Sequence, residues 1–173
     1  ERAKNINITV STSSIVPKPF TAFQWEAQDT REMLIKKQDA LKAAIPSKRI
    51  RYNWHDSKTS YLEGVFARGD RRLGKVLLEA HKQGCKFDGW GEFFSFERWM
   101  NVFDVCGVDP NFYNARKREF TEVLPWDHIS VGLTKQFFIN ECKKAYAETT
   151  TPNCREKCSG CGAASFGGGV CYE

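Results

Sequence analysis

The fold is decided by two short stretches, INITV at residues 6–10 and IRYNW at residues 50–54. Apolar and polar side chains alternate in both, which is typical of a half-buried β-strand. Between them, apolar residues recur at helical spacing from Gln28 to Ile45, and Pro46 ends the run. Strand, helix and strand in this order predict a parallel crossover unit. Such a unit belongs to a larger sheet or barrel, so we expect a helix-rich α/β fold.

Downstream of residue 56 the sequence predicts helices only. Apolar residues at spacings of three and four predict four of them, which begin at Asp56 or Ser57, at Asp70, near Phe96 and at Thr134. We expect these helices to pack through one core, formed by Leu62, Phe66, Leu77, Trp99, Phe103 and Phe138. The chain therefore divides into strands and a helix (1–56), a helical extension (57–148) and a cysteine-rich tail (149–173).

The tail carries the sharpest chemical signal. Cys154, Cys158 and Cys161 form a CxxxCxxC arrangement, and Cys171 follows after a glycine-rich stretch. Three thiols this close together can converge on one metal at little cost in loop entropy. The spacing suits an iron–sulfur cluster or a structural zinc, with Cys171 as a possible fourth ligand. Reduced, unligated thiols or a local disulfide are the alternatives.

Composition and charge narrow the class of protein. With 173 residues, 41% of them hydrophobic, the chain can bury the core of one domain plus a tail. We expect a cytoplasmic protein without a membrane partner, because no apolar run approaches a membrane span and the start has no signal pattern. In that compartment Cys85, Cys106 and Cys142 are expected to be buried thiols. A net charge of +5 allows contact with nucleic acid without demanding it. Because Glu1 takes the place of an initiator methionine, we expect a piece of a longer protein.

Two further groups of polar residues offer chemistry. His55–Asp56 and Asp127–His128 each place an imidazole beside a carboxylate, which suits proton transfer or metal binding, although Asp56 also suits a helix cap. Arg68, Asp70, Arg71 and Arg72 form a dense charge cluster that suits phosphate binding or, more simply, internal ion pairs. Lys18 and Gln24 suit contact with an anion or substrate, or a solvated loop. No glycine-rich phosphate loop, HExxH or GxSxG motif occurs.

Six phrases of the sequence together resemble one family. They are VPKPFTAFQW (16–25), YNWHD (52–56), ARGDRRLGKVL (67–77), FDGW (87–90), LPWDHI (124–129) and TTPNCREKCSGCG (150–162). In combination they resemble the carboxy-terminal part of cobalamin-domain-associated radical S-adenosylmethionine proteins, which are called iron–sulfur oxidoreductases. The resemblance covers nearly the whole chain.

The resemblance implies a full-length enzyme with a cobalamin-like domain, then a partial TIM-type barrel that binds S-adenosylmethionine and a 4Fe–4S cluster, then this region. It places the strand from Ile6 to Val16 late in the barrel, so that Ser11, Ser13 or the Val16 backbone borders the adenosine of the cofactor or the substrate. The cluster motif of the family opens the barrel, so we expect the tail cysteines to be structural and assign no catalytic residue. The rest of the full-length protein is expected to pack against this chain.

Two other functions stay open at this point. One is a zinc-stabilised module that binds RNA or protein and has no catalysis of its own. The other is a purely structural cap on the barrel. The substrate is not identified by the sequence.

Overall fold

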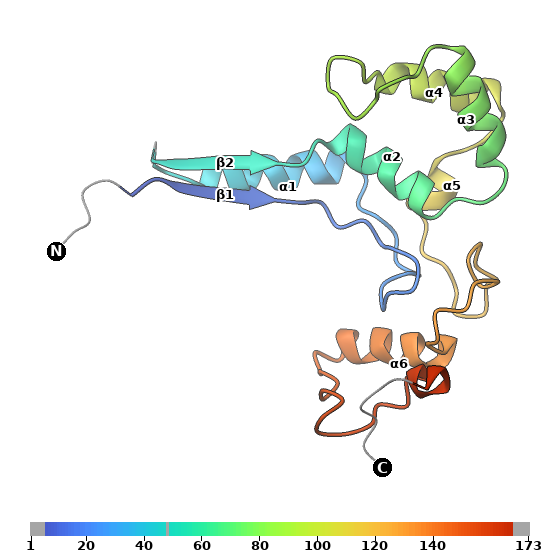
Figure 1. The fold of residues 1–173 in the computed structure, drawn as a ribbon. Helices are drawn as coiled ribbons and strands as arrows, with labels where there is room; N and C mark the ends of the chain where they lie inside the picture. The colour runs from blue at the N-terminus through green and yellow to red at the C-terminus, as the bar shows by residue number, and fades with distance from the viewer. Residues whose placement is uncertain (1–5, 48, 168–173) are drawn as a thin grey trace. The chain divides into compact units, whose positions relative to one another are not determined.

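A parallel pair of strands joined through a helix opens the fold (Figure 1). The computed structural model describes residues 6–47 and 49–167. Strand β1 (Ile8–Thr12) pairs with β2 (Ile50–Trp54) in a register that runs from Ile8 opposite Ile50 to Thr12 opposite Trp54. Helix α1 (Arg31–Ala44) connects them, and Thr30 caps it by accepting a hydrogen bond from the Met33 backbone N–H. The parallel pairing and the connecting helix are confirmed, whereas membership of a barrel stays a prediction.

The described residues form two compact units. The first consists of the residues up to Val16 together with Ala27–Arg116, and the second of Pro17–Glu26 with the residues from Lys117 onward. This grouping differs from the division at residues 56 and 148 predicted above. A segment of ten residues, Pro17–Glu26, leaves the first unit between its first strand and first helix, which a linear reading of composition does not reveal.

Four helices complete the first unit. They are α2 (Ser57–Ala67), α3 (Leu73–Lys82), α4 (Phe96–Val105) and the short α5 (Asn111–Asn114). Asp56 caps α2, because its Oδ1 accepts the backbone N–H groups of Lys58 and Thr59, each at 2.9 Å. The predicted start of α2 is therefore confirmed, as is that of α4, which Ser95 caps. Helix α3 begins at Leu73, three residues after the predicted start at Asp70. Helix α5 was not predicted, since four residues carry no helical period.

The core of the first unit is an apolar cluster between α2, α3 and α4. Its most deeply buried members are Val65, Val76, Val102, Phe103 and Tyr113. Trp99 and Phe103 are buried as predicted, but Leu77 is 52% exposed and its neighbour Val76 is fully buried. The prediction of Leu77 as a core residue is wrong, because α3 turns only a narrow face towards α4 and position 77 falls outside that face.

A buried amide joins three separate stretches of the first unit. The side chain of Gln28 donates through Nε2 to the Ser60 carbonyl (2.8 Å), and its backbone N–H donates to the Asn114 carbonyl (2.8 Å). Asn114 Nδ2 donates to Gln28 Oε1 (3.4 Å) and to the Tyr61 carbonyl (3.3 Å). A Cβ on Gly64 would lie 2.1 Å from Gln28 Oε1, so any side chain there would have to displace the Gln28 amide from its hydrogen bonds. This network fixes the start of α1 against α2 and α5.

The second unit has a core of its own. Helix α6 (Lys135–Tyr146) and the 3₁₀ helix η1 (Ala163–Phe166) are its regular elements, and Thr134 caps α6 as predicted. Its buried apolar residues are Trp25, Leu124, Trp126, Phe138 and Cys142. Gln24 is 3% exposed, and its Oε1 accepts from Trp126 Nε1 at 2.7 Å. Phe138 therefore belongs to a second core, and the prediction of one core through all the helices is wrong.

The parallel strands leave apolar side chains uncovered. Ile8 is 50% exposed, Trp54 is 46% exposed, and on α1 only Leu34 is buried. Helix α1 is tied to the end of β2 by a hydrogen bond from Gln38 Nε2 to the His55 carbonyl (2.9 Å). No helix of the described residues is long and apolar enough to cross a membrane.

The first core yields a test with an internal control. Replacing Phe103 by alanine should lower the free energy of unfolding by about 3–5 kcal/mol, because the side chain is 1% exposed and its removal leaves a cavity. The matched change Leu77→Ala on the neighbouring helix should cost less than about 0.5 kcal/mol. Urea unfolding followed by circular dichroism measures both, and equal costs would contradict the core described here.

Candidate functional site

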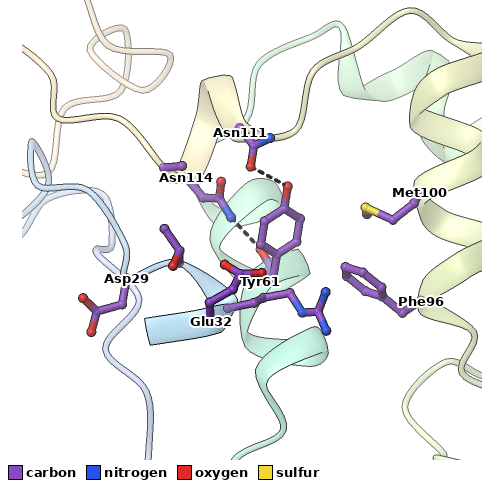
Figure 2. A pocket seen from close by; sticks show the side chains of 10 residues that line it. Asp29, Glu32, Tyr61, Phe96, Met100, Asn111 and Asn114 are labelled. Atoms are coloured by element: carbon purple, nitrogen blue, oxygen red, sulfur yellow. Dashed lines mark hydrogen bonds between the residues drawn. The ribbon is translucent and has the colours of Figure 1, made fainter. Parts of the chain in front are cut away.

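A cavity of about 440 Å³ lies in the first unit, between the start of α1 and helices α2, α4 and α5 (Figure 2). Its polar lining comes from Asp29 to Glu32, Tyr61, Asn111 and Asn114, and its apolar lining from Phe96 and Met100. The volume is within the range that small-molecule sites occupy. The buried network around Gln28 positions this cavity, because Asn114 belongs to both.

Arg31 is the cation of the cavity. Its guanidinium carbon lies 4.5 Å from the centre of the Phe96 ring, a cation–π contact that leaves the edge of the guanidinium for other partners. The Nε atom is buried and makes no hydrogen bond to any described residue. Arg31 also forms no salt bridge within the described part of the chain. A guanidinium whose donors are not used by the protein is a ready partner for a carboxylate.

Tyr61 lies between the two walls of the cavity, with the asparagines of α5 on one side and Phe96 and Met100 of α4 on the other (Figure 2). Its ring meets the Phe96 ring edge to face at 5.7 Å, and its hydroxyl donates to Asn111 Oδ1 at 2.9 Å. Burial, with a smaller contribution from Asp109, raises the pKa of Tyr61 to about 12. The phenol is therefore a neutral donor at physiological pH.

Asn114 is 2% exposed, and its Oδ1 has no hydrogen-bond partner among the described residues. Its Nδ2 is already used by Gln28 and Tyr61, so this orientation of the amide is fixed by its donors. A buried acceptor without a partner is unusual in a folded protein. Asn114 therefore lines the cavity with a polar side chain whose Oδ1 is shielded from solvent.

Two carboxylates flank Arg31. Asp29 is paired with Lys37 at 2.5 Å. A hydrogen bond from its own backbone N–H, helped by the Thr30 hydroxyl, lowers the pKa of the Glu32 carboxyl, which is ionised at neutral pH. Glu32 forms no salt bridge with a described residue, so the cavity presents one unpaired cation and one unpaired anion.

The cofactor-binding residues predicted from the sequence lie elsewhere. Ser11 is exposed on β1, Ser13 follows the strand, and Val16 is half-buried. Ser13 lines a smaller cavity of about 230 Å³ together with Asp29, Lys37 and Gln38, but Ser11 and Val16 do not line it. The structure therefore does not gather the three into one site.

The tail cysteines differ in how they are held. Cys154 and Cys158 are exposed, whereas Cys161 is half-buried. The Cys161 carbonyl accepts the backbone N–H of Thr134 at 2.9 Å, and its sulfur accepts the N–H of Ala163 at 3.4 Å. The third cysteine is thus anchored at the start of α6, and the other two lie on the exposed stretch before it.

The described residues contain no group of three histidines, cysteines or carboxylates close enough to hold a metal ion. Cys154, Cys158 and Cys161 are therefore not gathered, and Cys171 lies outside the described residues. The donor set itself still suits zinc or an iron–sulfur cluster, because three thiols lie within eight residues and Gly160 and Gly162 allow the backbone to turn.

The three cysteines before the tail differ in how deeply they are buried. Cys142 is buried as predicted, while Cys85 and Cys106 are half-buried, so the prediction that all three are buried is wrong for those two. Burial raises the pKa of both Cys142 and Cys85, which disfavours the reactive thiolate.

Three of the four residues in the two imidazole–carboxylate pairs have structural partners. Asp56 caps α2, and Ser60 Oγ lies 2.9 Å from His55 Nδ1. Asp127 accepts from the Leu124 N–H and from Lys135 Nζ.

Asp70 and Arg72 of the charge cluster and Gln24 of the loop have structural partners as well. Arg72 pairs with Asp70 through two nitrogens, and this pairing is the main reason that the pKa of Asp70 falls to about 2. Gln24 is buried against Trp126, and Lys18 is exposed. Internal ion pairing and helix capping thus account for most of these groups.

Comparisons of the chain with family models, with curated proteins and with solved structures found no match.

The residues that line the cavity were not predicted from the sequence. Arg31 reads as an ordinary polar residue on a helix, and Asn111 and Asn114 fall in a stretch without periodicity. Only the assembly of four elements brings them together, so the sequence offered no local signal for this site.

The anchor of Cys161 can be tested at the glycine that follows it. Gly162 has φ +100°, and a Cβ there would lie 3.0 Å from Thr134 Cγ2 and 3.1 Å from the Gly132 carbonyl oxygen. Gly162→Ala should therefore release the anchor and increase the rate at which Cys161 is alkylated, measured by mass spectrometry of tryptic peptides. Gly160→Ala is the matched control, because Gly160 shares the positive φ (+65°) but no atom lies within 4 Å of a Cβ at that position. Equal alkylation rates in the two variants would contradict this account.

Proposed function

We propose that this chain is the carboxy-terminal part of a radical S-adenosylmethionine iron–sulfur oxidoreductase. In this proposal residues 1–56 supply the last strands and helix of the partial barrel, residues 57–148 a helical extension, and the tail an auxiliary cluster or a structural zinc. S-adenosylmethionine, the catalytic 4Fe–4S cluster and cobalamin would be bound by the rest of a full-length, cytoplasmic enzyme. The observation that supports the proposal best is the parallel β1–β2 pair with uncovered apolar side chains.

Parallel strands are almost always covered on both faces and belong to sheets of several strands. Here Ile8 and Trp54 are about half exposed, and Val10 is 37% exposed. On α1, Met33, Ile35 and Leu41 are also more than 40% exposed. Further strands and helices beside this pair would bury these side chains, as the remainder of a barrel would.

The donor chemistry of the tail supports the metal part of the proposal. Cys154, Cys158 and Cys161 would be the ligands, with Cys171 as the fourth. A zinc ion would supply a structural cross-link, and a cluster would supply a site for electron transfer. The protein's own contribution is the anchor on Cys161, which holds one ligand at the start of α6.

The first test is the metal content of anaerobically purified protein. We expect one zinc ion or one iron–sulfur cluster per chain, measured by elemental analysis and the ultraviolet–visible spectrum. Cys158→Ser and Cys161→Ser should each lower the metal content at least about tenfold, because loss of a thiolate removes a ligand. Cys106→Ser, which removes a half-buried thiol outside the tail, is the control. Protein without zinc or iron, whose tail thiols all react while it is folded, would contradict the metal site.

The second test concerns catalysis. The 173-residue chain should form no 5′-deoxyadenosine from S-adenosylmethionine under a strong reductant, whereas a longer gene product with an upstream CxxxCxxC motif should form it. Chromatography of the products measures this. Turnover by the chain alone would make the tail cysteines the catalytic set. Absence of any longer product would favour the alternative, a zinc-stabilised module that binds RNA or protein.

A further inference from the structure

The cavity at the start of α1 offers groups that the rest of the molecule does not use. Arg31 has a buried Nε without a partner, and Asn114, which is 2% exposed, has an Oδ1 without one. Buried polar groups in a folded protein normally have partners. Both residues line the cavity, and although these two atoms are shielded from solvent, the η nitrogens of Arg31 also have no partner among the described residues and are not buried, so they can reach a ligand.

We propose that this cavity binds a free α-amino acid with an apolar side chain, whose carboxylate pairs with Arg31 and whose ammonium group pairs with Glu32. The proposal concerns a site in the helical part of the first unit and does not depend on the proposed function.

The charge of the lining selects this class of ligand. Arg31 is one cation beside two carboxylates, Asp29 and Glu32. Asp29 is neutralised by Lys37, which leaves one charge of each sign. A phosphate group would carry nearly two negative charges towards Glu32, so repulsion disfavours it. A zwitterion places one charge opposite each group.

The cavity also has apolar lining that suits the side chain of the amino acid. Phe96 and Met100 form one wall (Figure 2). The Phe96 ring also carries the Arg31 guanidinium on its face. This stacking holds the planar Arg31 guanidinium in one orientation. Less conformational entropy of the side chain is then lost when a carboxylate binds. Asn111 accepts the Tyr61 hydroxyl through Oδ1, so its amide nitrogen is left as a donor in the lining. A cavity of about 440 Å³ admits an amino acid the size of leucine or phenylalanine with room for water.

The experiment is calorimetric titration of the 173-residue protein with four probes. L-leucine and L-phenylalanine carry both charges, leucinamide lacks the carboxylate, and N-acetyl-L-leucine lacks the ammonium group. We expect saturable binding of at least one of the two amino acids. We also expect binding at least roughly tenfold weaker for each leucine derivative than for L-leucine, or none, because each lacks one charge-assisted hydrogen bond. Failure of both amino acids to bind, or binding of leucinamide equal to that of L-leucine, would overturn the proposal.

Two variants test which residue pairs with each charged group of the amino acid. Arg31→Gln should weaken binding of the amino acid roughly tenfold or more, and Glu32→Gln should abolish the advantage of L-leucine over its N-acetyl derivative. Lys36→Gln removes a positive charge from an exposed position of the same helix and should leave binding unchanged. Thermal unfolding of each variant checks that it is folded. If a variant does not fold, titration of the unaltered protein with the four probes still decides the proposal. An equal effect of Arg31→Gln and Lys36→Gln would overturn it.

Discussion

The first unit depends on the buried side chain of Gln28. Three residues before α1 begins, this amide reaches the Ser60 carbonyl of α2 and receives a hydrogen bond from Asn114 of α5. A buried polar group that loses its partner costs about 1–3 kcal/mol, so all three stretches must keep their places together. Gly64 permits the arrangement, because any side chain there would displace the Gln28 amide. The cavity beside Asn114 is a product of this constraint.

The same segment of chain serves both units through a pair of glutamines. Gln24 accepts the indole N–H of Trp126 in the second unit, and Gln28 organises the first. Each is almost fully buried, which is uncommon for glutamine and requires that its polar atoms be satisfied. Only three residues of the chain thus separate two buried amides that belong to different cores.

The helix caps and the order of strands and helices could be predicted from the sequence, but the packing between elements could not. The caps at Asp56 and Thr134 were predicted because a capping side chain bonds to backbone only a few residues away. The parallel strands were predicted because the crossover requires a helix between them. Leu77 was misplaced, because periodicity gives the apolar stripe of α3 but not how much of it α4 covers. The cavity was missed because its residues are brought together only by tertiary contacts.

The long reach of the Gln28 network has a consequence for how the chain folds. Gln28 and Asn114 are separated by 86 positions in sequence, so their bond forms only after a large loop has closed. Glycine at position 64 also makes α2 a weak helix by itself, by about 1 kcal/mol relative to alanine. Helices α3 and α4, by contrast, are neighbours in sequence and in space. We therefore expect α3 and α4 to associate early, and α2 to become fully helical only in the last, slow step, when the two ends of the unit meet around one amide group.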